Sequence, residues 1–214
     1  PATLLEIGTG RGYGAACMAQ ALEDIGGEGV VWTIDDMPSD VSQAWVLDEG
    51  DGPTVKQLSR QQVWDRHLPP PLTARIRCLT GPSHAILAQW RAAGRPSIDF
   101  CFIDGGHDYW TVKQDFIWAV RLARPGCAVL FDDYTDRRGY GVKRLLDDEV
   151  IPRLPPGAVE ILDLGYRDVT AFGEDVPHRM ALIRGVRPSL LEQCYRRPAV
   201  VRFERRARYV RSYR

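Results

Sequence analysis

The sequence predicts an α/β fold, a doubly wound and mostly parallel sheet of seven strands in a Rossmann-like arrangement with helices on both faces. Two observations support this prediction. Short β-rich runs alternate along the chain with longer segments of helical period. The first β-rich run also passes directly into a glycine-rich turn and a helix, as ligand-binding sheets of this class begin. A chain of 214 residues is long enough for one such domain.

The expected strands are short and end in turn signals. In chain order they cover residues 4–7, 29–34, 75–79, 98–103, 128–131, 159–164 and 180–183. The segments between them have apolar residues three and four positions apart, which predicts helices over 13–23, 83–93, 109–123 and 140–151. Asp108 stands at the N-cap position of the third helix.

Two segments fall outside this alternation. Residues 37–72 are too many for a simple connection, which typically takes about two to six residues, so we expect a helix around 55–67 in an insertion that builds the substrate side. Arg187 and Pro188 mark the expected end of the sheet domain. The predicted division is therefore a domain over 1–186 and an arginine-rich tail over 187–214.

The charges balance over the whole chain, with 28 Lys and Arg against 28 Asp and Glu, which gives no general attraction to nucleic acid or anionic lipid. The tail is locally basic. It is compatible with a solvated amphipathic helix or with contact to RNA, anionic lipid or a partner subunit, but no RNA-recognition motif accompanies it. Nucleic acid is therefore not an expected partner, and a homodimer stays open.

Five cysteines, odd in number and without a CxxC pair, argue against a disulfide framework and against a zinc site. A cytoplasmic location fits this cysteine usage best. No apolar run is long enough to span a bilayer, and no signal peptide is visible. Pro1 stands where an initiator methionine would, so we expect that a segment preceded it.

The glycine-rich turn is the first candidate binding site. Gly8, Gly10 and Gly12 follow the first strand directly, and glycines there let the backbone approach a ligand. A dinucleotide fingerprint is GxGxxG, whereas the spacing here is GxGxG and position 13 is Tyr13. This spacing, and the lack of a TyrxxxLys pair, disfavour a nicotinamide-dependent oxidoreductase.

Glu6 and the three glycines together resemble the first motif of class I S-adenosylmethionine-dependent methyltransferases. The resemblance implies that S-adenosylmethionine binds at Glu6, Gly8, Gly10, Gly12 and Tyr13, with Glu6 facing the methionine amino group. Asp35 ends the second strand, where a carboxylate can accept hydrogen bonds from both ribose hydroxyls. Ser83 lies in a segment that resembles the family's adenine side.

The reaction centre is expected at the ends of the fourth and fifth strands, which should be neighbours about 4.8 Å apart. Asp104 would then meet Asp132 and Asp133, and three crowded carboxylates call for a cation, for which Mg²⁺ suits the all-oxygen set. His107 follows Asp104 by three residues and has a reference pKa of about 6.5, which suits a general base.

The arrangement of Asp104, His107, Asp132 and Asp133 is similar to that of metal-dependent O-methyltransferases, and more closely resembles the methyltransferase 24 family. The resemblance covers residues 4–183. It implies methyl transfer to a hydroxyl of a sugar, a phenol or another natural product. Two alternatives stay open: a metal-independent enzyme in which Asp104 holds the cofactor's amino group, and a methyltransferase-like module without turnover.

Overall fold

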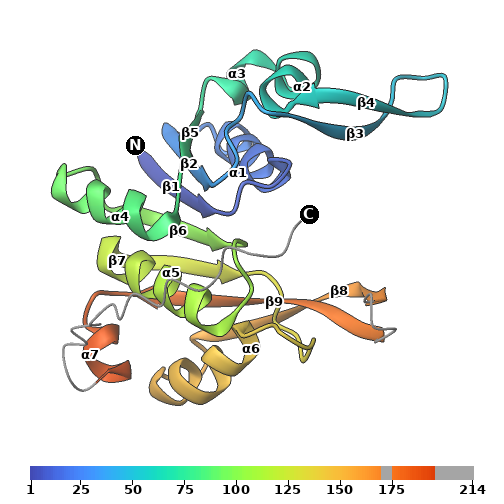
Figure 1. Cartoon of the computed structure of the whole chain (residues 1–214). Coiled ribbons are helices and arrows are strands. Elements are labelled where there is room, and N and C mark those ends of the chain that lie inside the picture. Colours follow the sequence, from blue (N-terminus) through green and yellow to red (C-terminus); the bar gives the residue numbers. More distant parts are fainter. Residues whose placement is uncertain (170–174, 196–214) are drawn as a thin grey trace.

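The computed structural model of the chain describes residues 1–169 and 175–195. Seven strands form one sheet in the order β5-β2-β1-β6-β7-β9-β8 (Figure 1). The strands are β1 (Ala2–Ile7), β2 (Gly29–Asp35), β5 (Ile76–Thr80), β6 (Ile98–Ile103), β7 (Ala123–Phe131), β8 (Val159–Val169) and β9 (Asp175–Val186). The first five pair in parallel, whereas β9 runs antiparallel to both β7 and β8. The predicted seven-stranded, mostly parallel sheet is confirmed.

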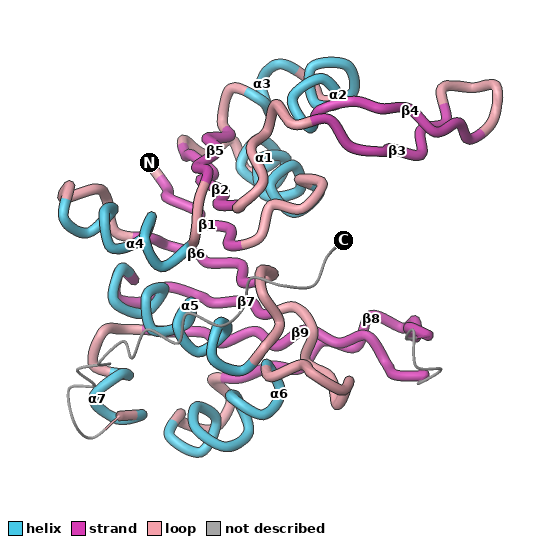
Figure 2. Tube along the Cα trace, viewed as in Figure 1, coloured by secondary structure: helices cyan, strands magenta, loops and turns pink. Residues whose placement is uncertain are grey.

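The helices lie on both faces of the sheet, as Figure 2 shows around the magenta strands. They are α1 (Tyr13–Asp24), α2 (Arg60–His67), α3 (Pro70–Thr73), α4 (Ser83–Ala92), α5 (Tyr109–Leu122), α6 (Val142–Leu145) and α7 (Leu190–Cys194). Successive residues of a strand point to opposite faces. In β1, Leu4 packs on a core cluster shared with α1, α2 and α3, and Leu5 belongs to the cluster of α4, α5, α6 and α7. The winding is therefore double, as predicted.

The insertion differs from the prediction. It contains a two-stranded antiparallel hairpin, β3 (Ser42–Asp48) and β4 (Pro53–Ser59), before α2 begins at Arg60. The predicted helix over 55–67 is thus wrong in its first turn. The physical reason is a capping box, in which the Ser59 side chain accepts from the amide of Gln62 and the Gln62 side chain accepts from the amide of Ser59.

Several strands are longer than predicted: β7 begins at Ala123 instead of residue 128, β8 ends at Val169 instead of residue 164, and β9 covers Asp175–Val186 instead of 180–183. The helix predicted from residue 140 begins at Val142 because the amide of Gly141 donates to the carbonyl of His107, 2.7 Å away. It continues through a π-helical turn, Leu146–Val150. The Asp108 N-cap is confirmed, since one carboxylate oxygen accepts from the amides of Trp110 and Thr111.

The predicted tail is described only over its first residues. Leu190 and Cys194 of α7 are buried in the cluster that also holds α5, so this short helix packs on the sheet domain. The arginines from Arg196 onward lie outside the described residues. Within the described ranges, no helix combines the length and the apolar character that a membrane crossing needs.

Candidate active site

The backbone hydrogen bonds between the parallel strands continue one residue beyond the carboxyl ends of β1, β6 and β7. The amide of Gly8 donates to Ile34, that of Asp104 to Ile7 and that of Asp132 to Ile103, at 2.8–3.1 Å. The turn after β1 and the acids after β6 and β7 are therefore fixed side by side at one edge. Ligands of doubly wound sheets bind at this edge.

Positions 8 and 12 require glycine both because of their backbone conformation and because a side chain would have no space. Both have positive φ, 95° and 84°. A Cβ on Gly8 would overlap the backbone carbonyl of Asp104, and one on Gly12 would overlap the ring of Trp64. The turn thus packs closely against the expected reaction centre at Gly8 and against the insertion at Gly12.

Glu6 lies below the turn and is 1% exposed. It accepts a hydrogen bond from the Thr33 hydroxyl, and Thr33 Oγ1 also lies 2.6 Å from Thr9 Oγ1. Burial is the main reason why the pKa of Glu6 is raised to about 8. The hydrogen bond from Thr33 lowers this pKa, and the charge of Asp104 raises it further. The Glu6 carboxylate therefore needs a positive partner to be ionised at neutral pH.

Asp35 closes β2 and is held by three donors. Its Oδ2 accepts from the amide of Gly10 at 2.8 Å and from Arg60 at 3.3 Å, and its Oδ1 accepts from the amide of Met37 at 2.8 Å. Arg60 comes from the start of α2 and was not among the predicted site residues. The insertion thus contributes directly to the site expected to bind ribose.

The remaining predicted cofactor residues are Ser83, after the outer strand β5, and Tyr13, after the inner strand β1. Ser83 begins α4 and donates from its hydroxyl to Asp115 Oδ1 at 2.5 Å. Burial raises the pKa of Asp115 to about 6. Tyr13 begins α1 with 82% of its surface exposed, so the part of the chain that the structure describes does not enclose this ring.

Two of the three predicted acids, Asp104 and Asp133, come together at the ends of β6 and β7 with His107, whereas Asp132 lies outside this group of three. One possible metal-ligand atom from each of Asp104, His107 and Asp133 lies within 4.8 Å of the other two. Asp132 is near enough for its charge to raise the pKa of Asp104. His107 Nδ1 lies 2.8 Å from Asp133 Oδ2. We refer to Asp104, His107, Asp132 and Asp133 as the acid cluster.

The electrostatics of the acid cluster favour added positive charge. Burial raises the pKa of Asp104 to about 7, and the charges of Asp132 and Asp133 contribute to the rise. The hydrogen bond with Asp133 raises the pKa of His107. Carboxylate oxygens at this spacing fit a hard cation such as Mg²⁺.

Backbone geometry aims Asp133 into the cluster. Among the described residues other than glycine, only Asp133 has a positive φ, 56°. Such a conformation is uncommon outside glycine, and strained residues of this kind concentrate at functional sites. It turns Asp133 toward His107 while Asp132 follows the strand.

His178 is a neighbour that the sequence did not reveal. Its Nε2 lies 3.0 Å from Asp132 Oδ1, and its ring stacks on Tyr166 with centroids 4.7 Å apart. β9 brings it there, because the amide of Tyr134 donates to Arg179 of that strand. On the other side, Tyr140 stacks on His107 at 4.6 Å. No local motif marks either residue, because each reaches the site through a distant element.

Two other polar side chains, those of Tyr134 and His67, have partners outside the acid cluster. The Tyr134 hydroxyl donates to Asp147 Oδ1 at 2.6 Å. His67 Nε2 lies 3.9 Å from Glu49 at the exposed surface of the insertion. Neither residue belongs to the acid cluster.

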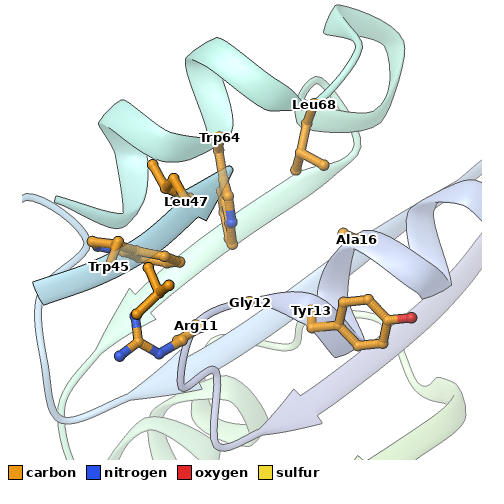
Figure 3. A pocket seen from close by; sticks show the side chains of 9 residues that line it. Arg11, Gly12, Tyr13, Ala16, Trp45, Leu47, Trp64 and Leu68 are labelled. Atoms are coloured by element: carbon orange, nitrogen blue, oxygen red, sulfur yellow. The ribbon is translucent and has the colours of Figure 1, made fainter. Parts of the chain in front are cut away.

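A cavity of about 510 Å³ separates the insertion from α1 (Figure 3). Trp45, Trp64 and Leu68 line it from the insertion, and Arg11 and Tyr13 line it from the start of α1. The Arg11 guanidinium lies over the Trp45 ring at 4.8 Å. The cavity borders the glycine turn, but no residue of the acid cluster lines it.

Comparison with solved structures identifies the same architecture in several proteins. TomG, an O-methyltransferase of Streptomyces achromogenes solved with SAM, is 20% identical over 85% of this chain and 72% of its own, with a TM-score of 0.56. An O-methyltransferase of Bacillus cereus solved with SAH is 23% identical over 85% and 73%, with a TM-score of 0.53. Cofactor-bound Rv0187 from MTB is 21% identical over 86% of this chain and 73% of its own, with a TM-score of 0.54. At these identities the likeness supports the fold.

A search of curated proteins found no significant match. The family is given instead by a family model, described as a methyltransferase domain, which matches residues 5–134. This match runs from β1 through the glycine turn and Asp104 to the end of β7, and so includes every residue of the acid cluster. The resemblance stated from the sequence is confirmed: the chain belongs to the methyltransferase 24 family and is a methyltransferase with the class I fold.

Proposed function

We propose that this chain is an S-adenosylmethionine-dependent O-methyltransferase that acts on a hydroxyl of a small molecule, such as a sugar, a phenol or another natural product, with Mg²⁺ and a histidine base. One observation carries the proposal. The carboxylates of Asp104 and Asp133 and the His107 ring converge at the carboxyl ends of β6 and β7, against the glycine turn. Methyl donor and acceptor would meet at that edge.

The acid cluster fits a magnesium ion. Asp104, Asp132 and Asp133 would hold it through carboxylate oxygens, which are the ligands this ion prefers. When bound, Mg²⁺ lowers the pKa of a hydroxyl that it touches and stabilises the oxyanion. S-adenosylmethionine supplies an electrophilic methyl group on its sulfonium, and Glu6, the glycine turn and Asp35 would hold its polar ends.

His107 would remove the proton from the acceptor. Its Nδ1 faces Asp133 Oδ2, so Nε2 is the ring nitrogen left to accept a proton. Asp133 would stabilise the resulting imidazolium, as a carboxylate does for a base histidine in other transfer enzymes. The enzyme's main contribution is alignment, since the positive sulfonium and the developing oxyanion neutralise each other.

A metal-independent methyltransferase is the second candidate. It is favoured by the position of Asp104, whose backbone carbonyl packs against Gly8 of the glycine turn and whose charge contributes to the raised pKa of Glu6, at the predicted methionine end of the cofactor. In that case Asp104 would hold the amino group rather than a cation.

The decisive experiment measures release of S-adenosylhomocysteine from S-adenosylmethionine with panels of phenols and sugars, with Mg²⁺ and with EDTA. Under the proposal, EDTA abolishes turnover and Mg²⁺ restores it, while S-adenosylhomocysteine binding survives EDTA. Full turnover in EDTA would select the metal-independent candidate. Failure of the wild-type chain to bind S-adenosylhomocysteine would contradict both.

A further inference from the structure

Arg60 is a buried cation that links the insertion to the glycine turn. It is 2% exposed, although it is the first residue of a helix that is otherwise largely at the surface. Its Nε donates to the carbonyl of Gly10 at 2.9 Å, and one terminal nitrogen donates to Asp35 Oδ2 at 3.3 Å. One side chain thus contacts both the turn and the acid expected to bind ribose.

The surroundings explain why this guanidinium stays below the surface. Burying a charge is costly unless it is paired and hydrogen-bonded. Arg60 is paired with Asp35, and its charge also lowers the pKa of Glu6. It therefore offsets the negative charge of both acids on the cofactor side of the sheet edge.

The acceptor sites of Asp35 can be counted. A carboxylate has about four lone-pair sites, two on each oxygen. On Oδ2 they are used by the amide of Gly10 and by Arg60, and on Oδ1 one is used by the amide of Met37. One site is left, on Oδ1. Asp35 is thus oriented before a ligand arrives and can accept one ribose hydroxyl while Arg60 stays in place, instead of the two hydroxyls expected from the sequence.

We propose that Arg60 is a positioning residue of the cofactor site, by which the insertion fixes Asp35 and Gly10 for the ribose of S-adenosylmethionine. The proposal rests on the proposed function, because it takes that cofactor as the ligand. It adds that the insertion sets cofactor affinity, in addition to any role on the acceptor side. The planar fork of arginine, more than its charge, is what spans Gly10 and Asp35.

The test is a calorimetric titration of S-adenosylhomocysteine into wild type, Arg60→Lys and Arg66→Lys. Lysine keeps the charge but cannot reach both partners, so we expect Arg60→Lys to weaken binding on the order of tenfold. Arg66 lies exposed on the same helix and serves as the matched control, with unchanged affinity expected. Circular dichroism melting of each variant shows that the comparison is between folded proteins.

A second titration separates positioning from a general structural effect. If Arg60 acts through Asp35, its substitution should cost little for an S-adenosylhomocysteine analogue without ribose hydroxyls, and Asp35→Asn with Arg60→Lys should cost less than the sum of the two single changes. Equal affinity of Arg60→Lys and wild type, or tighter binding by the variant, would overturn this inference alone. Absence of binding by the wild type would overturn the proposed function with it.

Discussion

At the residue scale, the pairing of His107 with Asp133 determines what the histidine can do. The 2.8 Å contact occupies Nδ1 and leaves Nε2 as the ring nitrogen that can accept a proton. It also raises the pKa of His107, which strengthens the ring as a base but increases its protonated fraction at neutral pH. Activity should therefore rise with pH as the ring loses its proton.

The first prediction concerns His107→Gln. Glutamine fills the position without accepting a proton at neutral pH, so kcat should fall by about two orders of magnitude or more, as for loss of a general base. Binding of Mg²⁺ and of S-adenosylhomocysteine should persist. Turnover assays and calorimetry check both parts, with His67→Gln in the exposed insertion as control. Loss of metal affinity together with kcat would identify His107 as a ligand rather than a base.

The second prediction concerns the proton on Glu6. With a pKa of about 8, Glu6 is mostly protonated at pH 7 before the cofactor arrives. The cofactor's ammonium group favours the carboxylate, so binding should release a proton and should tighten as the pH rises from about 6 to 8. Calorimetry in buffers of different ionisation enthalpy measures the release. Glu6→Gln should abolish that part of the release, and an unchanged release in this variant would refute the assignment.

The acids of the site could be predicted from the sequence, but two of their partners could not. Asp104, Asp132 and Asp133 end neighbouring parallel strands, and such ends meet at one edge whatever the loops do. His178 reaches Asp132 only because β9 returns antiparallel beside β7. Arg60 reaches Asp35 only through the path of an insertion. Neither approach depends on spacing along the chain.

At the element scale, the insertion is the part of the fold that the sequence described least well. Val46 and Val55 pair across β3 and β4 and are exposed at 70% and 69%, whereas the neighbouring Trp45 is buried. Apolar residues therefore occur on both faces of the hairpin, and no apolar-polar alternation marks its strands in the sequence. A readable signal was present in Ser59 and Gln62, whose spacing is that of a capping box and would have placed the start of the helix at residue 60.

The third prediction tests how the insertion is anchored. Trp64 is 5% exposed, packs in the cluster of α1 and β5, and contacts Gly12. Trp64→Ala should lower the free energy of unfolding by about 3 kcal/mol, through lost burial and the cavity left behind. It should also weaken S-adenosylhomocysteine binding, because the turn loses its support. Urea denaturation and calorimetry measure the two effects, with Trp110→Ala, exposed at 73%, as control. Equal stability of both variants would contradict this role.

At the scale of the whole molecule, the chemistry lies along one edge of the sheet. The β3–β4 hairpin and the outer ends of β8 and β9 extend past the carboxyl ends of β1, β6 and β7 on the same side (Figure 1). The sheet order brings Glu6, Asp104 and the neighbouring acids to that edge, where burial works against their ionisation. The ligand-free protein therefore carries an electrostatic cost where it is expected to bind cations.

The fourth prediction follows from this cost. The pKa values of Glu6, Asp104 and Asp115 are raised to about 8, 7 and 6, and that of His107 is raised as well. Between about pH 4 and 8 the folded chain consequently binds more protons than the unfolded chain, so stability falls as the pH rises through this window. The melting temperature without ligands should be higher at pH 6 than at pH 8.5. Mg²⁺ and S-adenosylhomocysteine should raise it more at pH 8.5, because both bind the ionised acids. Calorimetric scans at the two pH values measure whether the melting temperature falls or rises with pH, and Asp104→Asn removes one of the shifted groups. A melting temperature that rises with pH would show that these acids are ionised at no cost in the folded protein.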